Sequence, residues 1–117
     1  MLAYKNRFHG HGSLRYVMKN GQINRGRFFV IKHTVNRKRL HPRVSIIVSK
    51  KISKRAVERN RIRRRLYEQF RSFLPDIPEH TDIACIVTSK EVLKVEHQIL
   101  TAVLSKDIQT FLSYQSD

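Results

Sequence analysis

The spacing of apolar residues along this chain predicts three helices and three or four strands. Leu14, Val17 and Met18 fall at positions i, i+3 and i+4, which places them on one face of a helix. Ser13 precedes them as a candidate N-cap, and Asn20-Gly21 supplies a stop signal. The pattern therefore predicts a short first helix that ends before the glycine.

Residues 27–34 are rich in β-branched and aromatic side chains, which is typical of a strand. Side chains alternate between the two faces of a strand, so this segment divides into two sets. The first set is Phe29, Ile31 and His33, and the second is Phe28, Val30 and Lys32. We expect Phe29 in the core, and Phe28 partly exposed on the face that ends in Lys32.

A second strand is predicted at residues 43–49, where Val44, Ile46 and Val48 share one face. Residues 36–42 between the two strands are polar and basic and end in a proline, as in an exposed hairpin loop. Because a hairpin joins neighbouring strands, we expect the two strands to pair antiparallel.

The longest helical pattern begins after Ser53, a candidate N-cap. It ends at Leu74-Pro75, because the residue before a proline is disfavoured in a helix. A rotation of about 100° per residue gives one continuous apolar stripe. The members of this stripe are Ile62, Leu66, Phe70, Phe73 and Leu74. This side of the helix is expected to face the core.

The other side of the same helix is strongly basic. Arg61, Arg64 and Arg71 project away from the stripe, and Glu68 is a candidate ion-pair partner one turn after Arg64. Arg59 projects toward the stripe instead, so its stem should lie along the sheet edge with the guanidinium emerging beside it. We therefore expect a helix with one buried side and one cationic side.

The C-terminal third contains a predicted strand and a predicted helix. Residues 82–88 form a nearly continuous apolar run of strand length, and a strand after a helix indicates a crossover connection. The last helix is predicted from about Val95 to Leu112, either continuous or broken near Ser105-Lys106-Asp107. The chain ends, residues 1–6 and 113–117, are expected to fray.

Length and composition indicate a single domain, residues 1–117. A chain of 117 residues with 40% hydrophobic residues can build one core but not two. No apolar stretch approaches the ~20 residues needed to cross a bilayer, and residues 1–7 lead into no hydrophobic signal region. We therefore expect a cytoplasmic protein that does not engage a membrane.

Charge is distributed very unevenly along the chain. The net charge is +15, and residues 1–71 contain 21 of the 24 basic residues but only two of the nine acidic ones. Ten of the 22 residues from Lys50 to Arg71 are lysine or arginine. Because like charges repel one another unless a polyanion neutralises them, the basic half predicts binding to nucleic acid.

Metal sites and disulfides find little support in the sequence. Cys85 is the only cysteine and lies in an apolar run, which indicates a core residue and excludes an internal disulfide. His9-Gly10-His11-Gly12 offers two histidines without a third ligand, which is a weak metal motif. The acidic residues of the C-terminal half are expected on loops and helix ends, without the cluster that a magnesium-dependent nuclease needs.

Beyond these patterns, the sequence resembles a known family. Its segments Ser49-Lys50-Lys51-Ile52 and Ala56-Val57-Glu58-Arg59-Asn60-Arg61-Ile62-Arg63-Arg64 are similar to the Arg-Asn-Arg signature of the bacterial ribonuclease P protein component. The family's order is also kept outside the signature, at Arg7-Phe8, the first predicted helix, residues 27–32, Arg43-Val44 and the spacing to Asp82. The resemblance covers essentially the whole chain.

The resemblance implies an α+β fold, a two-layer α/β sandwich of the ribosomal protein S5 domain 2-like type. Such a fold has a mixed sheet of about four strands, three helices and a left-handed βαβ crossover through the signature helix. Neither this handedness nor a fourth strand follows from the apolar pattern, and the general preference is for a right-handed crossover.

The resemblance also implies a function. The catalyst of this family is an RNA, which removes the 5′ leader of precursor tRNA by hydrolysing one phosphodiester bond with RNA-bound Mg2+ ions. The protein would then be an RNA-binding subunit of the holoenzyme, with no catalytic residue of its own and no obligate protein partner. Its partners would be the catalytic RNA and precursor tRNA.

Two RNA-binding surfaces follow from matching residues to the family pattern. The signature helix and the loop before it would meet the catalytic RNA through Lys50, Lys51, Lys54, Arg55, Arg59, Asn60, Arg61, Arg63, Arg64 and Arg65. A cleft between the first helix and the exposed sheet face would bind the single-stranded leader through Leu14, Met18, Phe28, Val30 and Lys32. Relatives commonly carry aromatic residues in this cleft, so we expect weaker base stacking here and a larger share for Lys32. Tyr67 stands where the family often has arginine, and we expect it to have a structural role beside the apolar stripe.

Two other classes of protein share some of these features. A ribosomal or other structured-RNA-binding protein would have the same charge and sandwich fold, but it would not stimulate cleavage of precursor tRNA. A DNA-binding module would need a helix that reads base edges in a major groove. The signature helix has one asparagine among many arginines, which indicates phosphate contacts rather than base reading.

Overall fold

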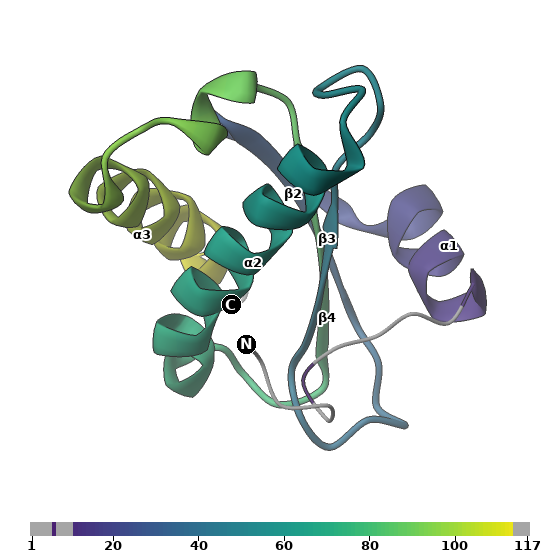
Figure 1. Cartoon of the computed structure of the whole chain (residues 1–117). Coiled ribbons are helices and arrows are strands. Elements are labelled where there is room, and N and C mark those ends of the chain that lie inside the picture. Colours follow the sequence, from purple (N-terminus) through teal and green to yellow (C-terminus); the bar gives the residue numbers. More distant parts are fainter. Residues whose placement is uncertain (1–5, 7–10, 114–117) are drawn as a thin grey trace.

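The computed structural model describes Asn6 and residues 11–113. Its elements in chain order are α1 (His11–Asn20), β1 (Gln22–Arg25), β2 (Phe29–Val35), β3 (Arg43–Ile47), α2 (Ala56–Phe73), the 3-10 turn η2 (Leu74–Asp76), β4 (Thr81–Val87), the 3-10 turn η3 (Lys90–Leu93) and α3 (His97–Ser113). The strands form one mixed sheet, with α2 and α3 on one face and α1 on the other (Figure 1). The expected α+β class and four-stranded mixed sheet are therefore confirmed.

β4 occupies the middle of the sheet, whose strand order is β1-β2-β4-β3. It pairs antiparallel with β2, where Phe29 lies opposite Val87, and parallel with β3, where Arg43 lies opposite Asp82. Six of its seven residues are buried. Burial on both faces explains why its sequence is a nearly continuous apolar run. Because α2 connects the parallel neighbours β3 and β4, the predicted crossover is present.

The predicted antiparallel hairpin between residues 27–34 and 43–49 is wrong. β2 and β3 run in opposite directions, but β4 lies between them, so the two strands do not pair. Residues 36–42 cross the end of β4 instead of forming a tight turn between neighbours. An apolar strand from late in the sequence takes the central place because it can bury side chains on both faces.

β1 is the strand that the apolar pattern did not predict. Its sequence, Gln22 to Arg25, is mostly polar and exposed, and it pairs antiparallel with β2 at the edge of the sheet. Its one apolar side chain, Ile23, is 45% exposed. An edge strand of this kind depends on main-chain pairing rather than on an apolar face, so its sequence carries little strand signal.

The main core lies between the sheet and the two helices α2 and α3. The stripe predicted for α2 is confirmed, since Ile62, Leu66 and Phe70 are fully buried while Phe73 and Leu74 pack at its edge. α3 contributes Leu100, Leu104, Ile108 and Phe111. Because Leu104 and Ile108 are buried on the same face, α3 continues without a break between them. Cys85 is fully buried in this core, as predicted.

A smaller cluster lies under α1, on the second face of the sheet. Val17 packs on Ala84, and both are fully buried. α1 ends at Asn20, and the N–H of the next residue, Gly21, donates to the Val17 carbonyl oxygen (2.8 Å). A Cβ at this position would lie 2.5 Å from the same oxygen, so the turn into β1 requires glycine. The predicted first helix and its stop are confirmed, but the predicted N-cap at Ser13 is wrong, because α1 already begins at His11.

The entry into α2 differs by two residues from the prediction. Arg55 rather than Ser53 occupies the N-cap position. The Ser53 hydroxyl accepts from the Arg55 N–H (3.3 Å) and donates to Glu58 (2.5 Å), so it fixes the chain just before the helix. Ser53 therefore stabilises the start of α2 from outside the cap position.

The two ends of the chain lie largely outside the described residues. Asn6, which was expected to fray, is buried and donates from its side-chain amide to the Pro42 carbonyl oxygen (2.9 Å). At the other end, α3 extends to Ser113. Between residues 11 and 113, no helix combines the length and apolar character needed to cross a bilayer.

Candidate RNA interface

The buried stripe of α2 determines which of its side chains face outward. Ile62, Leu66 and Phe70 are fully buried against the sheet, which fixes the rotation of the helix. Arg61 and Arg64 are consequently exposed on the opposite side, as predicted. Both guanidinium groups are therefore presented to solvent on a rigid element.

Glu68 and Arg71 continue the outward side of α2 toward its C-terminus. The Arg71 side chain is 67% exposed and lies 3.8 Å from Glu68, the residue predicted to pair with Arg64. An exposed ion pair at this distance contributes little stability. The positive charge on this side of the helix is therefore densest at Arg61 and Arg64, toward the N-terminal half.

Three lysines precede α2 in a tight loop. The Ile52 N–H donates to the Ser49 carbonyl oxygen (3.1 Å), which closes a turn, and the Ile52 side chain packs on the core. Lys50, Lys51 and Lys54 are exposed around this anchored turn. The loop therefore holds its cations beside the start of α2 without burying them.

Glu58 is the one acidic residue in the first turn of α2. The hydrogen bond from Ser53 lowers the pKa of its carboxyl group, and the positive charges of Lys90, Arg55 and Arg61 lower it further. The Arg55 guanidinium lies 3.8 Å from this carboxylate. Glu58 thus stays ionised and helps to fix the entry into α2, because an anion is favoured at a helix N-terminus.

Three other arginines of α2 contact main-chain carbonyl groups of neighbouring loops. Arg59 donates to the carbonyl oxygen of Ser53 (2.9 Å), and Arg63 donates to that of Val48 (3.4 Å). Arg65 donates to the carbonyl oxygens of both Val92 (2.7 Å) and Val95. These half-buried side chains therefore tie the loops on either flank of α2 to the helix, although free N–H groups remain on each guanidinium.

Asn60 lies between the two groups of arginines. Its side-chain oxygen accepts from Arg63 (2.9 Å), and the side chain is exposed. The amide group keeps two N–H donors for a ligand. All ten residues predicted for the signature surface therefore lie on α2 or its preceding loop, but Arg59, Arg63 and Arg65 also have a structural role.

Four of the five residues predicted for the leader cleft come together on the second face of the sheet. Leu14 and Met18 of α1 are half-buried beside Val17, and Val30 and Lys32 of β2 are half-buried on the strand below. We call these four residues the α1–β2 surface. It combines apolar side chains with one cation, which suits an unpaired nucleotide chain better than a duplex.

Lys32 joins the two elements of the α1–β2 surface. Its ammonium group donates to the carbonyl oxygen of Met18 in the last turn of α1 (2.9 Å). A cation at the C-terminus of a helix interacts favourably with the helix dipole. Two of the three N–H donors of Lys32 remain available for a phosphate.

Phe28 does not belong to this surface, so its predicted place in the cleft is wrong. It is 1% exposed and packs in the main core, with its ring 6.0 Å from that of Phe29. β2 begins only at Phe29, so the alternation of faces does not extend to residue 28. The Arg27 guanidinium lies over its ring, 4.9 Å from the centre, and covers it from solvent.

The register of the sheet adds residues that the sequence did not single out. Arg25 of β1 lies opposite Val30, and Ile86 of β4 lies opposite Val30 on the other side. Residues directly opposite each other share a face, so the exposed Arg25 places a second cation beside the α1–β2 surface. Only a prediction of β1 and of its pairing with β2 could have identified Arg25.

Tyr67 lies beside the apolar stripe of α2, where a structural role was predicted for it. Tyr67 is 7% exposed, and its hydroxyl accepts from the Ile46 N–H (3.3 Å), so its structural role is confirmed.

The side chains of His9 and His11, the two histidines of the candidate metal motif, lie outside the described part of the chain. Among the described residues, no group of three or more histidine, cysteine or acidic side chains could hold a metal ion.

Comparisons with known proteins identify the family. The family model for ribonuclease P matches residues 2–111. The ribonuclease P protein component of Pseudanabaena sp. (strain PCC 6903) is 34% identical over 89 residues, covering 76% of this chain and 77% of that protein. The component of Prochlorococcus marinus (strain AS9601) is 32% identical over 95 residues, covering 72% of this chain and 74% of that protein.

Solved structures show the same similarity in three dimensions. The RNase P protein of Staphylococcus aureus matches with a TM-score of 0.77 and 25% identity, covering 90% of this chain and 94% of that one. The RNase P protein of Thermotoga maritima shares the fold with a TM-score of 0.74, at 24% identity, and covers 86% of this chain and 92% of that one. With a family model that spans nearly its whole length and relatives that match about three quarters of it, the chain belongs to the ribonuclease P protein family.

Proposed function

We propose that this chain binds the catalytic RNA of ribonuclease P and the 5′ leader of precursor tRNA, and so assists removal of the leader. The observation that carries the proposal is the outward side of α2, where Arg61 and Arg64 are exposed on a helix whose rotation is fixed by buried residues. The relatives are named as protein components of this enzyme, which implies an RNA subunit as partner.

The catalytic RNA would contact α2 and the loop before it. Arginine presents a planar fork that donates to two phosphate oxygens at once, whereas lysine acts as a compact point charge. Arg61 and Arg64 supply the forks, and Lys50, Lys51 and Lys54 supply point charges beside them. This face suits the backbone of a folded RNA, because phosphate contacts position a nucleic acid without reading its bases.

The leader would contact the α1–β2 surface on the other face of the sheet. Leu14, Met18 and Val30 offer apolar contact to unpaired bases, and Lys32 offers charge to a phosphate. Arg25 extends this positive charge along β1. Because α1 and α2 cover opposite faces of the sheet, the protein would lie between the catalytic RNA and the leader.

Cleavage itself would be carried out by the RNA, with magnesium ions bound mainly by the RNA. Acidic side chains are the usual protein ligands of magnesium. The buried carboxylate of Asp82 accepts from Arg43 at both oxygens (2.8 and 2.7 Å) and from Asn36 (3.0 Å), which leaves it poorly placed to bind a metal. In this proposal the protein binds and orients RNA.

Reconstitution tests this proposal directly. The protein is added to a bacterial ribonuclease P RNA at low magnesium, and formation of mature tRNA is followed with a precursor that carries a leader. We expect the protein to stimulate cleavage by the RNA and to cleave nothing when the RNA is omitted. An RNA-binding protein without a role in cleavage would bind the RNA and give no stimulation, and cleavage by protein freed of RNA would contradict the proposal.

A further inference from the structure

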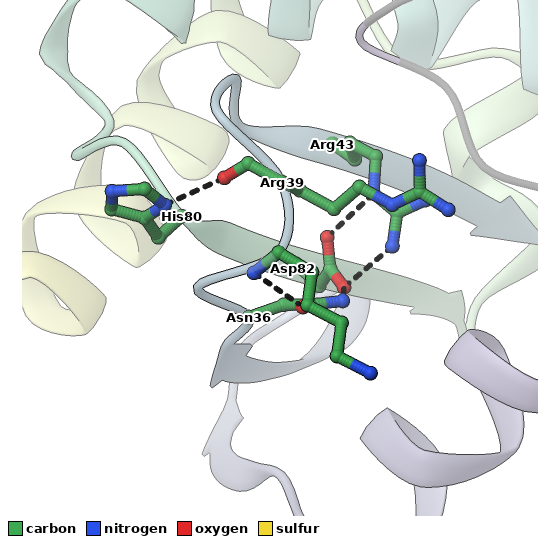
Figure 2. A network of polar contacts seen from close by, with 6 residues as sticks. Asn36, Arg39, Arg43, His80 and Asp82 are labelled. Atoms are coloured by element: carbon green, nitrogen blue, oxygen red, sulfur yellow. Dashed lines mark hydrogen bonds and ion pairs between the residues drawn. The ribbon is translucent and has the colours of Figure 1, made fainter.

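The loop after β2 is held in one conformation by a network of polar contacts (Figure 2). The side-chain amide of Asn36 donates to Asp82 (3.0 Å), and its side-chain oxygen accepts from the Lys38 N–H (3.2 Å). The Arg39 N–H donates to the Asn36 carbonyl oxygen (3.0 Å), which closes a turn. Residues 36–39 therefore form an ordered turn rather than a loose loop.

His80 holds this turn from the segment before β4. Its carbonyl oxygen accepts from the Asn36 N–H (2.6 Å), and its Nδ1–H donates to the Arg39 carbonyl oxygen (2.7 Å). The backbone of His80 has φ 65°, which lies in the left-handed region that residues other than glycine seldom adopt. The hydrogen bonds that the main chain and the ring of His80 make with the turn hold the residue in this conformation.

The ordered turn presents three consecutive cations. Arg37, Lys38 and Arg39 are exposed, and within residues 11–113 no hydrogen bond or ion pair is recorded for their side chains. The nearby carboxylate of Asp82 does not offset them, because it is buried and paired with Arg43. The turn is therefore a fixed site of positive charge.

A hollow of about 700 Å³ separates this turn from α1. Arg37, Lys38 and Arg39 line one side of it, and Ser13 and Tyr16 line the other. A second hollow of about 610 Å³ shares Tyr16 and Arg37 with the first and extends to His80. The Tyr16 side chain is 57% exposed, so its ring is accessible beside the cations. We call this region, with the three cations and Tyr16, the Tyr16 hollow.

These groups match the chemistry of an unpaired nucleotide. An aromatic ring stacks on the face of any base, and adjacent lysine and arginine side chains neutralise the flanking phosphates. A duplex would not expose a base face to Tyr16. The Tyr16 hollow therefore suits a single strand of RNA.

We propose that the Tyr16 hollow binds the part of the precursor leader that lies farther from the cleavage site than the nucleotides on the α1–β2 surface. This inference rests on the proposed function. Both surfaces are built from the same two elements, since Ser13 adjoins Leu14 in α1, and Val35 ends the strand that carries Val30 and Lys32. At about 3.3 Å per residue, Val30 and Val35 lie within about 17 Å of each other, a span of a few nucleotides.

The test uses the reconstituted holoenzyme and precursors whose leaders are lengthened one nucleotide at a time. In the unmodified holoenzyme, we expect affinity to rise with the first nucleotides and to rise again when the leader reaches the Tyr16 hollow. Replacing all three cations (R37A/K38A/R39A) should remove only the second gain, on the order of ten-fold, and should reduce the magnitude of the salt slope for long leaders by about two. Tyr16→Ala should weaken binding of long leaders roughly five-fold, whereas Tyr16→Phe, which keeps the ring, should not.

A charge-matched control is provided by the three basic residues that follow residue 71. Lys90, Lys94 and Lys106 are exposed in the C-terminal part of the chain, and the variant K90A/K94A/K106A loses the same charge. We expect it to keep both gains. An equal loss in this control would show a long-range charge effect and overturn the proposal, and so would a loss in R37A/K38A/R39A that is the same at every leader length.

The two proposals fail in different ways in this experiment. If the unmodified holoenzyme shows the first gain but no second one, the Tyr16 hollow is refuted while the proposed function stands. If leader length has no effect on affinity, leader binding by this protein is refuted altogether. A comparison of Tm values confirms that each variant is folded.

Discussion

The arginines of α2 fall into two groups that differ in what they contact. Arg61 and Arg64 face solvent, whereas Arg59, Arg63 and Arg65 donate to carbonyl oxygens of neighbouring loops. All five residues are arginines of the same helix, and members of the two groups are close neighbours in the sequence. The density of positive charge in a sequence therefore overstates how many side chains are free to bind RNA.

Helical geometry explains the division. Successive residues are rotated by about 100°, so Arg59 and Arg63, four residues apart, lie on the flank of α2 that faces the loop after β3. Arg65 lies on the other flank, beside the segment between η3 and α3. Arginines on a flank meet the carbonyl groups of loops, whereas Arg61 and Arg64 on the outer side meet water or a ligand.

The largest expected effect is the response of RNA binding to salt, which tests the outward group as a whole. Affinity for the catalytic RNA should fall on the order of 10³-fold between about 50 and 200 mM salt, because each phosphate contact releases counterions. Filter binding or fluorescence titration at several salt concentrations measures this dependence. A flat titration would remove the outward side of α2 as a phosphate-binding face.

Replacing Arg61 and Arg64 together by alanine tests the two outward arginines directly. We expect RNA affinity to fall roughly 10- to 100-fold, because two charge-assisted contacts are lost, while the Tm changes little. The double variant K94A/K106A removes the same charge from exposed side chains outside α2 and the loop before it, and it should bind RNA almost normally. A Tm drop as large as that of a core variant would mean that the two arginines support the fold.

Replacing Arg65 by alanine tests the flank group. Two main-chain carbonyl groups lose their donor, so we expect the free energy of unfolding to fall by about 2 kcal/mol, with a Tm several degrees lower. Thermal unfolding followed by circular dichroism measures this change. Arg64→Ala, one position away with the same change of charge, is the control, and equal Tm values for the two variants would contradict the division into groups.

Asp107 extends the comparison to a buried carboxyl group. Burial raises its pKa to about 6, and among the described residues one of its carboxyl oxygens has no hydrogen-bond partner. Because the folded-state pKa lies above the unfolded one, the neutral acid favours folding below about pH 4, and this contribution is lost as the pH rises through 6. Asp107→Asn should therefore increase the free energy of unfolding by roughly 1 kcal/mol at pH 7 to 8 and have little effect near pH 4. Urea unfolding at both pH values measures the difference, and an equal effect at both would contradict it.

The sequence predicted those parts of the fold in which side chains alone determine the structure. The stripe of α2 was predicted correctly because Ile62, Leu66 and Phe70 recur at helical spacing and all face one core. β1 and the position of β4 could not be predicted in this way. They depend on which strands pair with which, and main-chain pairing at an edge leaves almost no mark on side chains such as Gln22 and Asn24.

The candidate site shows the same limit. Sequence and family pattern together located the ten residues on α2 and its loop, and the helical angles separated Arg61 and Arg64 from Arg59. The contacts of Arg65 could not be predicted, because Val92 and Val95 are about 30 residues away and their carbonyl groups carry no sequence signal. Phe28 was misplaced because the alternation of a strand was extended one residue beyond its true start.

The ion pair between Arg43 and Asp82 also has a consequence for how β3 and β4 find their alignment. The two residues lie opposite each other at the first rung of the parallel ladder, and both side chains are almost completely buried. A slip of the ladder by one residue would turn the carboxylate to the other face of the sheet and separate two opposite charges in a dry interior. Misaligned sheets are therefore penalised electrostatically, and a single salt bridge helps to select the one correct alignment of the strands that α2 connects.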